Sequence, residues 1–342
     1  MSKLFYYNIS RENSKKIYSI DSNILINMSR YFYNGHCHNE IETKNIVDFI
    51  LLAKKNGWIE YEDAIIETCF NYTTNCLEAK ALNGYMNVID NLIMYETPQE
   101  VIVTKSNYKP DMRFDNTCNI SSILNCTIVN CFLRKEDGIP NGNIAFYSTY
   151  LYNLKLLDLN QDKFLSNIEK LKNFYHFMAT EIGYISGLHL ILAQMLFIGN
   201  QESFNVAQKI LKPKTKYSYR DLINSTIDML HIQITFLKQG LSYQFEQPCD
   251  YVIVTQDIGL IELCKMIEHI YMAFGNENSI AFYEFKNDIS EEHCEEWRLF
   301  YESIYEEMKQ RVFEFFIHDV DRDKIMDNII EKIPSLEKSI IN

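Results

Sequence analysis

The sequence predicts an α/β fold in which many helices flank a short parallel sheet. Two short apolar runs, Lys16 to Ile20 and Tyr251 to Thr255, are rich in β-branched and aromatic residues. Each run leads through a few polar residues into a helical pattern, and a strand that feeds a helix in this way opens a βαβ unit. The chain has only 11 Gly and 6 Pro among its 342 residues. So few helix-breaking residues favour long helices over a sandwich of short strands.

Helical patterns fill most of the chain around these two runs. Residues 119–212 are predicted to be mostly helical, with turns at Pro140 to Gly142 and at Gly199 to Asn200. Gly57 has the place of a C-terminal cap for the helix before it. The other segments with apolar residues at three- and four-residue spacing are 24–33, 41–56, 60–72, 76–95, 219–238 and 260–272.

Two further strand candidates and an acidic tail complete the prediction. Val101 to Thr104 is a short β-rich run, and the polar residues 105–118 after it form a predicted loop. Ile280 to Phe285 is the last strand candidate. From Ser290 onward the chain is acidic and helical in pattern.

The chain is acidic, with a formal net charge of −13. A protein that coats duplex DNA through phosphate contacts is usually basic, so a broad nucleic-acid footprint is not expected. Acidity is compatible with a nuclease, because a metal-binding carboxylate cluster is itself acidic and the metal supplies positive charge. The charge therefore favours a small, local substrate contact or a basic partner.

The nine cysteines are scattered without a CxxC pair, so reduced and mostly buried thiols are expected. The closest group, Cys118, Cys126 and Cys131, lacks zinc-site spacing. His36-Cys37-His38 stands beside a predicted turn and is a weak metal signal.

The sequence predicts a cytoplasmic protein without membrane attachment. The start of the chain lacks the apolar core and cleavage site of a signal peptide. The most apolar run, Leu188 to Ile198, is shorter than the roughly 20 residues that span a bilayer. It is interpreted as a buried helix.

Both strong strand candidates carry an acid where they end. Asp21 directly follows the first run, and Asp257 lies two residues beyond Thr255. Ligands of open parallel sheets bind beyond the carboxyl ends of the strands, so the two acids are expected to meet there. For either acid alone, the alternative is a helix N-cap, because an Asp before a helix satisfies free N–H groups. As a pair, they favour a shared metal site.

The segments around these acids resemble PIN-domain nucleases. IYSIDSNILI, which contains Asp21, is similar to the family's opening strand, which ends in Asp, a small hydroxylated residue, Asn and aliphatics. YVIVTQDIGL resembles the later strand that ends in Thr-x-Asp. Asp228 begins DMLHIQIT, which looks like a family helix that starts with Asp, and Ala64-Ile-Ile-Glu67 matches an early helix with a Glu. The order Asp, Glu, Asp, Asp is the family's order.

The resemblance implies a PIN-like three-layer fold and a division of the chain. Residues 1–110 and 215–289 would form the nuclease core. Residues 111–214 would be a helical insertion within it, since the gap between Glu67 and Asp228 is long. Residues 290–342 would be an acidic C-terminal helical segment.

The resemblance also implies a divalent metal, Mg²⁺ or Mn²⁺. Asp21, Asp228 and Asp257 would bind it, and Glu67 would act as a ligand or base. Hard carboxylate oxygens suit these ions, which favour one or two carboxylates each. Four nearby acids remain alternatives for the role of Glu67: Glu60, Glu62, Asp63 and Glu78.

Polar and basic residues near these acids are candidates for contacts with substrate. Ser22 and Thr255 would hydrogen-bond a phosphate or fix the carboxylates. A basic patch precedes the Asp228 helix, and its alternative interpretation is a solvated helix end. Tyr217 and Tyr219 lie within it and would stack on bases. The patch consists of Lys209, Lys212, Lys214, Lys216 and Arg220.

The resemblance predicts a metal-dependent endonuclease that hydrolyses phosphodiester bonds, with RNA as substrate and single-stranded DNA as the alternative. It also suggests a toxin or defence role and an inhibitory or regulatory protein partner, while the oligomeric state stays open. The rival function is a catalytically inactive PIN-like scaffold that binds a protein partner. A haloacid dehalogenase-type phosphatase is set aside, because that chemistry needs a second Asp where this chain has Asn23.

Overall fold

A computed structural model describes most of the chain. Val101 to Thr104, the loop after it and the turn at Pro140 to Gly142 lie outside the described residues, so those predictions are not addressed. The described residues are 3–9, 15–71, 76–77, 79–94, 144–214, 216–242, 248–274, 279–285, 289–317 and 322–341.

The chain folds into two compact units. The first contains Met1–Asn143 and Ile234–Ile261, and the second contains Ile144–Gln233 and Glu262–Asn342. Helix α12, Tyr219–Ser242, begins in the second unit and continues into the first. The domain division expected from the sequence stays a prediction.

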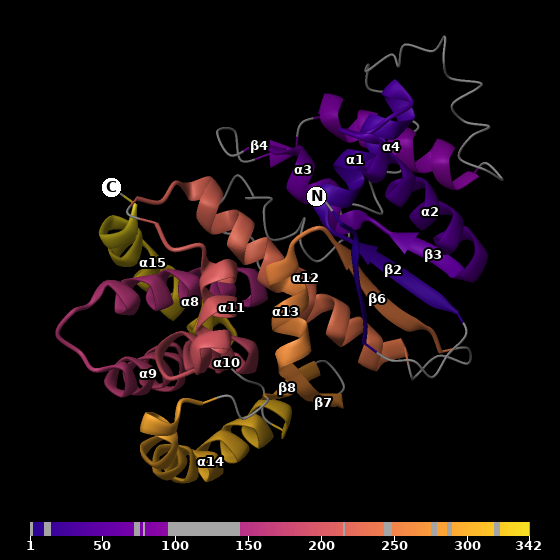
Figure 1. The fold of residues 1–342 in the computed structure, drawn as a ribbon. Helices are drawn as coiled ribbons and strands as arrows, with labels where there is room; N and C mark the ends of the chain where they lie inside the picture. Colours follow the sequence, from indigo (N-terminus) through magenta and orange to yellow (C-terminus); the bar gives the residue numbers. More distant parts are fainter. Residues whose placement is uncertain are drawn as a thin grey trace. The chain divides into compact units, whose positions relative to one another are not determined.

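The first unit is built on a four-stranded, mostly parallel sheet, which confirms the predicted α/β class (Figure 1). Strand β2 pairs in parallel with β3 on one side and with β6 on the other, and β1 pairs antiparallel to β6. The sequence analysis did not predict β1 and β3, which are short edge strands. The strands are β1 Phe5–Asn8, β6 Asp250–Thr255, β2 Lys16–Ile20 and β3 Gly57–Glu60.

The two central strands are buried, as expected for parallel strands covered on both faces. Every residue of β6 is buried, and in β2 only Lys16 is partly exposed. Lys16 compensates the fully buried carboxylate of Asp250 at the start of β6, with 2.6 Å between Nζ and Oδ2. The two strongest sequence patterns therefore lie side by side in the core.

Helices cover both faces of this sheet, which gives the unit three layers. Neighbouring residues of a strand point to opposite faces. The Tyr18 ring meets Phe49 of α2, Glu40–Asn56, whereas the Ser19 hydroxyl accepts a hydrogen bond from Thr235 of α12. Tyr6 and Tyr7 of β1 repeat the alternation, since Tyr6 contacts Phe49 and Tyr7 contacts Phe236.

Helix α1, Ser22–Asn34, leads away from β2 on the face of the sheet that α2 also covers. It ends at Gly35, whose φ of 79° is left-handed and therefore suits glycine. The predicted helix over residues 60–72 is shorter, because Glu60 pairs with β2 as the last residue of β3. The remaining elements here are α3 Glu62–Cys69, β4 Phe70–Asn71, β5 Cys76–Leu77 and α4 Ala79–Met94.

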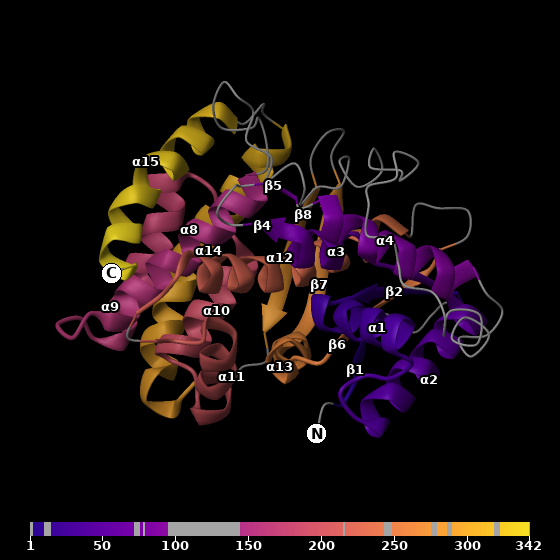
Figure 2. The same ribbon diagram turned by 90° about the horizontal axis from the view of Figure 1, so that it is seen from above.

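The second unit is mostly helical, as predicted for the middle of the chain and its acidic tail (Figure 2). A capping box at Ser166 and Glu169 begins α9. Asn200 caps α11, which confirms the predicted turn before it. The helices are α8 Ile144–Gln161, α9 Asn167–His176, α10 Gly187–Phe197, α11 Gln201–Leu211, α14 Cys294–Ile317 and α15 Arg322–Ile340, with a π-helical turn at Phe177–Ile182.

The predicted helix over residues 260–272 is wrong in its second half. Helix α13 covers only Ile258–Met266, and β7 follows at Ile267–Phe274. Strand β7 pairs antiparallel with β8, Ser279–Phe285, which confirms the last strand candidate. The run IEHIYMAF is rich in residues that favour strands, and its neighbour in the hairpin decides its conformation.

Within the described residues, no helix combines the length and the apolar character that crossing a bilayer requires.

Gly57 leaves no room for a side chain, because a Cβ there would lie 1.6 Å from the carbonyl oxygen of Lys16. We expect Gly57→Ala to push β3 away from β2 and to lower the free energy of unfolding by about 3 kcal/mol. Chemical denaturation measures the change, with the exposed Lys55→Ala as control. Equal stability of the two variants would contradict the pairing of β3 with β2.

Burial lowers the pKa of His189 in α10 to about 3. In the unfolded chain the group titrates near 6.5, so below that pH the unfolded state takes up a proton that the folded state does not. The free energy of unfolding should therefore fall by about 2 kcal/mol between pH 6.5 and 5 through this group. Chemical denaturation across this range should show that the free energy of unfolding depends less on pH in His189→Gln than in the wild type. The same pH dependence in both proteins would refute the lowered pKa of His189.

Candidate functional site

The carboxyl ends of β2 and β6 form the edge at which the candidate site lies. Ile20 pairs with Val254, and the backbone N–H of Asp21 donates to the Val254 carbonyl at 3.0 Å. From β2 the chain continues through helices to β3 on one side, whereas β6 lies on the other side. This arrangement is a topological switch point, where open α/β sheets bind their ligands.

Asp21 has the position of a helix cap but does not act as one. It precedes α1 with extended backbone angles, yet its side chain accepts no capping hydrogen bond within the described residues. Asp21 is 6% exposed, and its carboxylate accepts from Ser22 Oγ at 3.2 Å, Asn23 Nδ2 at 3.2 Å and Thr255 Oγ1 at 2.6 Å. The helix-cap interpretation of Asp21 is therefore wrong.

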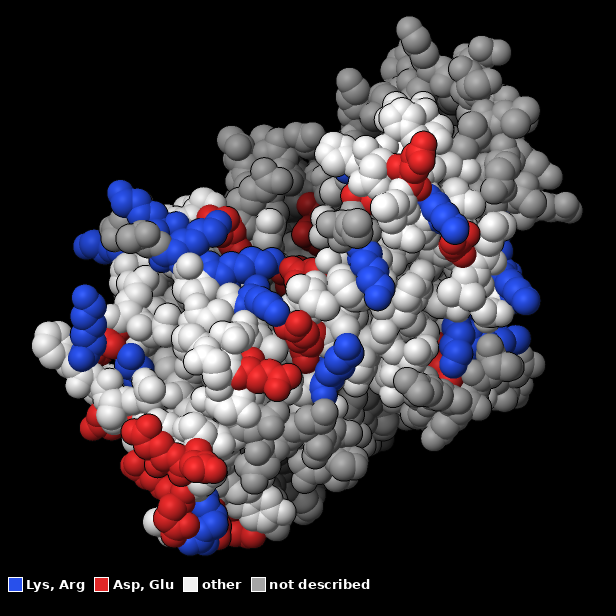
Figure 3. Space-filling model, viewed as in Figure 1, with Lys and Arg blue, Asp and Glu red and all other residues white. Residues whose placement is uncertain are grey.

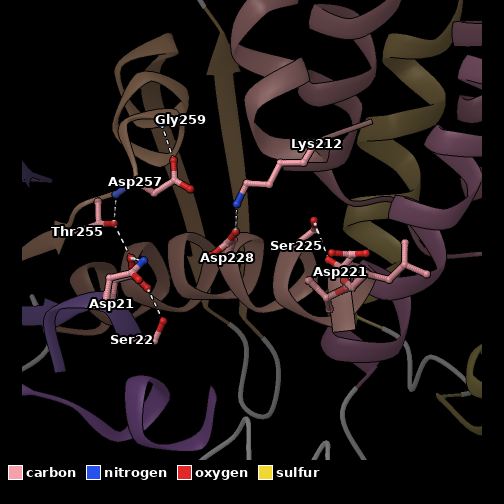
Figure 4. A network of polar contacts seen from close by, with 12 residues as sticks. Asp21, Ser22, Lys212, Asp221, Ser225, Asp228, Thr255, Asp257 and Gly259 are labelled. Carbon is pink, nitrogen blue, oxygen red and sulfur yellow. Dashed lines mark hydrogen bonds and ion pairs between the residues drawn. The ribbon is translucent and has the colours of Figure 1, made fainter. Parts of the chain in front are cut away.

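Thr255 connects the ends of the two central strands (Figure 4). Its hydroxyl donates to Asp21 Oδ2 and accepts from the backbone N–H of Asp257 at 2.8 Å. Ser22 donates to the other oxygen of the same carboxylate. Both hydroxyls thus fix the Asp21 carboxylate, which is one of the two roles expected for them.

Asp257, unlike Asp21, caps the helix that follows it. Its Oδ1 accepts from the backbone N–H of Gly259 at 2.7 Å, in the first turn of α13. This contact is the capping interaction that the sequence analysis weighed as the alternative. A metal-binding role for Asp257 stays a prediction.

Glu67 brings a second carboxylate to Asp21 from a different element. It lies on α3, which packs against α1, and one of its oxygens is within 4.8 Å of an Asp21 carboxylate oxygen. Glu60, an alternative for its role, forms a 2.9 Å ion pair with Lys238 of α12. Glu67 is thus better placed than Glu60, whereas the side chains of Glu62, Asp63 and Glu78 lie outside the description.

Asp228 lies on α12, in the part that belongs to the second unit. Its side chain is 12% exposed, and Oδ2 is 3.3 Å from Nζ of Lys212. His231, one turn further, is a buried helix residue. Asp228 and Thr235 are seven residues apart, which is nearly two turns, so they share one face of α12.

The predicted basic patch is a set of exposed lysines that are largely engaged by acids. Lys209 pairs with Glu262 at 2.6 Å, Lys214 pairs with Asp221 at 2.6 Å, and Lys212 pairs with Asp228. Lys216 is exposed, and the side chain of Arg220 lies outside the description. Each ion pair is solvent-accessible on at least one side and so adds little stability.

The two tyrosines of this patch differ in exposure. Tyr217 is 5% exposed and its hydroxyl accepts from the backbone N–H of Lys214 at 2.7 Å, so the expected stacking on bases is wrong for it. Its hydroxyl instead binds the backbone of the turn before α12. Tyr219 is 52% exposed, and its hydroxyl donates to Glu337 at 3.3 Å.

Two residues of the site were missed in the sequence analysis. Asn23 donates to Asp21, and the signal was its place two residues after a strand-end Asp. Asn27 donates to Gln256 Oε1 at 3.0 Å and accepts from Arg30 at 3.1 Å, and thus ties α1 to the segment between Thr255 and Asp257. The signal was a polar residue on the buried face of an apolar helix.

No protein-family model, curated protein or solved structure matches this chain. The resemblance to PIN-domain nucleases therefore rests on the four sequence segments alone.

Thr255→Val should weaken the site and the fold together. Valine has a similar volume but removes the closest of three donors from the buried Asp21 carboxylate and takes the Thr255 hydroxyl away from the Asp257 N–H, which costs about 1–3 kcal/mol. Thr255→Ser keeps the hydroxyl and serves as the control. Chemical denaturation should rank the proteins with Val clearly below Ser, and equal values would contradict the bridging role.

Proposed function

We propose that this protein is a metal-dependent endonuclease that hydrolyses phosphodiester bonds, with RNA as the preferred substrate. In this proposal Asp21 and Glu67, whose carboxylate oxygens lie within 4.8 Å of each other, bind one divalent ion, and Asp228 is the third ligand that the resemblance implies. The observation that carries it is the state of Asp21. A carboxylate that is buried at a strand end and held by three side-chain donors, but does not cap the helix after it, is oriented in advance as a metal ligand needs to be.

Helix α12 carries Asp228 on the same face as Thr235, a residue that contacts the sheet. The end of this helix lies at the start of β6, because Gln239 Oε1 accepts from the backbone N–H of Tyr251 at 2.6 Å. Going back along α12 therefore leads toward the carboxyl ends of the strands, and Thr235 already meets Ser19 of β2. Asp228 lies about two turns before Thr235 on the same face, roughly 10 Å away along the helix. Its role as third ligand rests on the resemblance, in which an Asp begins this helix.

The donor set suits Mg²⁺ or Mn²⁺. Only carboxylate oxygens are offered, and hard oxygen ligands favour these ions over zinc or copper. A divalent ion at this place would stabilise the negative charge that develops on a phosphate during hydrolysis. Carboxylates this close repel one another, so a bound cation would also remove the electrostatic repulsion that is present in the metal-free protein.

The protein's own residues divide the remaining tasks. Ser22 and Thr255 hold the Asp21 carboxylate in one orientation, which positions a ligand before the substrate arrives. Glu67 is the candidate base, because it is partly exposed and therefore open to water. Asp257 would orient the water or hold a second ion while its other oxygen caps α13.

Substrate class and cellular role rest on the resemblance. Lys212, Lys214, Lys216 and Arg220 would contact the substrate backbone, and a toxin or defence role would involve an inhibitory protein partner. A cytoplasmic location is supported by five free thiols, of which all but Cys294 are buried: Cys37, Cys69, Cys249, Cys264 and Cys294. Single-stranded DNA is the alternative substrate.

One surface favours the rival function of a scaffold that binds a protein. Helix α14 carries exposed apolar groups, with Leu299 at 54%, Tyr301 at 38% and Tyr305 at 41%. Acidic residues such as Glu295 and Glu302 surround them, and Figure 3 shows acidic side chains gathered at the lower left, over α14. Exposed apolar side chains among acidic ones are typical of a surface that binds a basic protein.

The nuclease function predicts metal-dependent cleavage that requires Asp21. Asp21→Asn should reduce the cutting of a labelled RNA with Mn²⁺ by at least about a hundred-fold, because one ligand charge is lost. EDTA should abolish cutting by the wild type. Asp48→Asn, an exposed change of the same charge in the same unit, is the matched control. Equal cutting by the wild type and Asp21→Asn would refute the proposal.

Metal binding should also stabilise the fold. An ion that binds only the folded state raises stability by about 2.7 kcal/mol at a hundred times its dissociation constant. Thermal unfolding with and without Mn²⁺ should show a rise in the midpoint for the wild type and for Asp48→Asn. Glu67→Gln and Asp21→Asn should show little rise, and a full rise in both would place the ion elsewhere.

A further inference from the structure

Lys212 occupies a backbone position that disfavours its side chain. It caps the end of α11 with φ 47° and ψ 54°, and it is the one described non-glycine residue with positive φ. The left-handed region suits Gly or Asn at this position, since the Cβ of other residues clashes there. Pro213 adds to the strain, because the residue before a proline is biased toward extended conformations. Glycine would serve the backbone better.

The side chain at this strained position reaches a proposed metal ligand. Lys212 Nζ is 3.3 Å from Asp228 Oδ2, and both residues belong to the second unit. The lysine is 48% exposed, so it can leave the contact without rebuilding the core, whereas Asp228 is only 12% exposed. In the metal-free protein, the Lys212 ammonium therefore neutralises the Asp228 carboxylate, to which a divalent cation would bind in the proposed site.

We propose that Lys212 holds the place of the metal on Asp228 and turns to the phosphate of the substrate once the metal is bound. This inference rests on the proposed nuclease function and adds a regulatory step to it. The ammonium and the metal compete for one carboxylate, so a bound metal releases the lysine. A released ammonium beside the metal is a point charge suited to a phosphodiester oxygen. The side chain is thus retained at a position where the backbone favours glycine.

Lys214 provides a matched control within the same turn. It is equally exposed, at 48%, and pairs with Asp221, which is not a proposed ligand. Lys214→Gln changes the charge by the same amount two residues away. Any effect of general charge or of salt on the patch should therefore appear in both variants.

The first test is Mn²⁺ affinity by titration calorimetry on the full chain. Lys212→Gln should bind Mn²⁺ roughly ten-fold more tightly than the wild type, because a competing positive charge is gone. Lys212→Arg and Lys214→Gln should bind like the wild type. Equal affinities of the two Gln variants would overturn this inference and leave the nuclease proposal standing. Absence of Mn²⁺ binding by the wild type would overturn both.

The second test separates the side chain from the backbone. In metal-free thermal unfolding, Lys212→Gly should melt about 2 °C above Lys212→Gln, because both lack the charge and only Gly relieves the strained turn. With Mn²⁺ and labelled RNA, both variants should nevertheless cut at least about ten-fold more slowly than the wild type. Equal melting of the two, or cutting at the wild-type rate, would overturn the proposed role of Lys212.

Discussion

The parallel pairing of β2 with β6 is the constraint on which the candidate site depends. It joins segments 234 residues apart, and it sets Asp21 beside Thr255 at the carboxyl end of the sheet. Each strand alone ends in a few polar residues that could cap a helix. When the strands pair, the hydroxyl of Thr255 donates to the carboxylate of Asp21. The two strand ends thereby form one polar edge next to the apolar core.

Burial of the Asp21 carboxylate explains why so many donors surround it. A charged group removed from water is costly unless hydrogen bonds replace the lost hydration. Ser22, Asn23 and Thr255 supply these bonds from α1 and β6 together. The same bonds prevent the carboxylate from turning to the free N–H groups of α1. A group that is held in place but not consumed by capping is suited to binding a cation, as pre-organised ligands are in general.

Helix α12 begins in the second unit and ends in the first. Its second half packs on the sheet through Thr235 and Phe236, and its first half carries Asp228 and lies near the lysines that follow α11. Helical periodicity allows a residue of one half to share a face with a residue of the other. The turn that ends α11 holds Lys212 in a left-handed conformation, and from there its ammonium pairs with Asp228.

Local patterns were sufficient for some features of this protein and insufficient for others. The apolar runs of β2 and β6, the Asn200 cap and most helices follow from residue type and spacing, so the sequence by itself determined the α/β class and the acids at the strand ends. It could not determine how those acids are used. Asp21 and Asp257 stand in similar local surroundings, yet only Asp257 caps its helix, because the donors that hold Asp21 come partly from a distant strand. Residues 267–272 became a strand for the same reason, since pairing with β8 outweighed their helical spacing. Tertiary contacts decide such cases because local alternatives differ by about 1 kcal/mol, which a few long-range hydrogen bonds exceed.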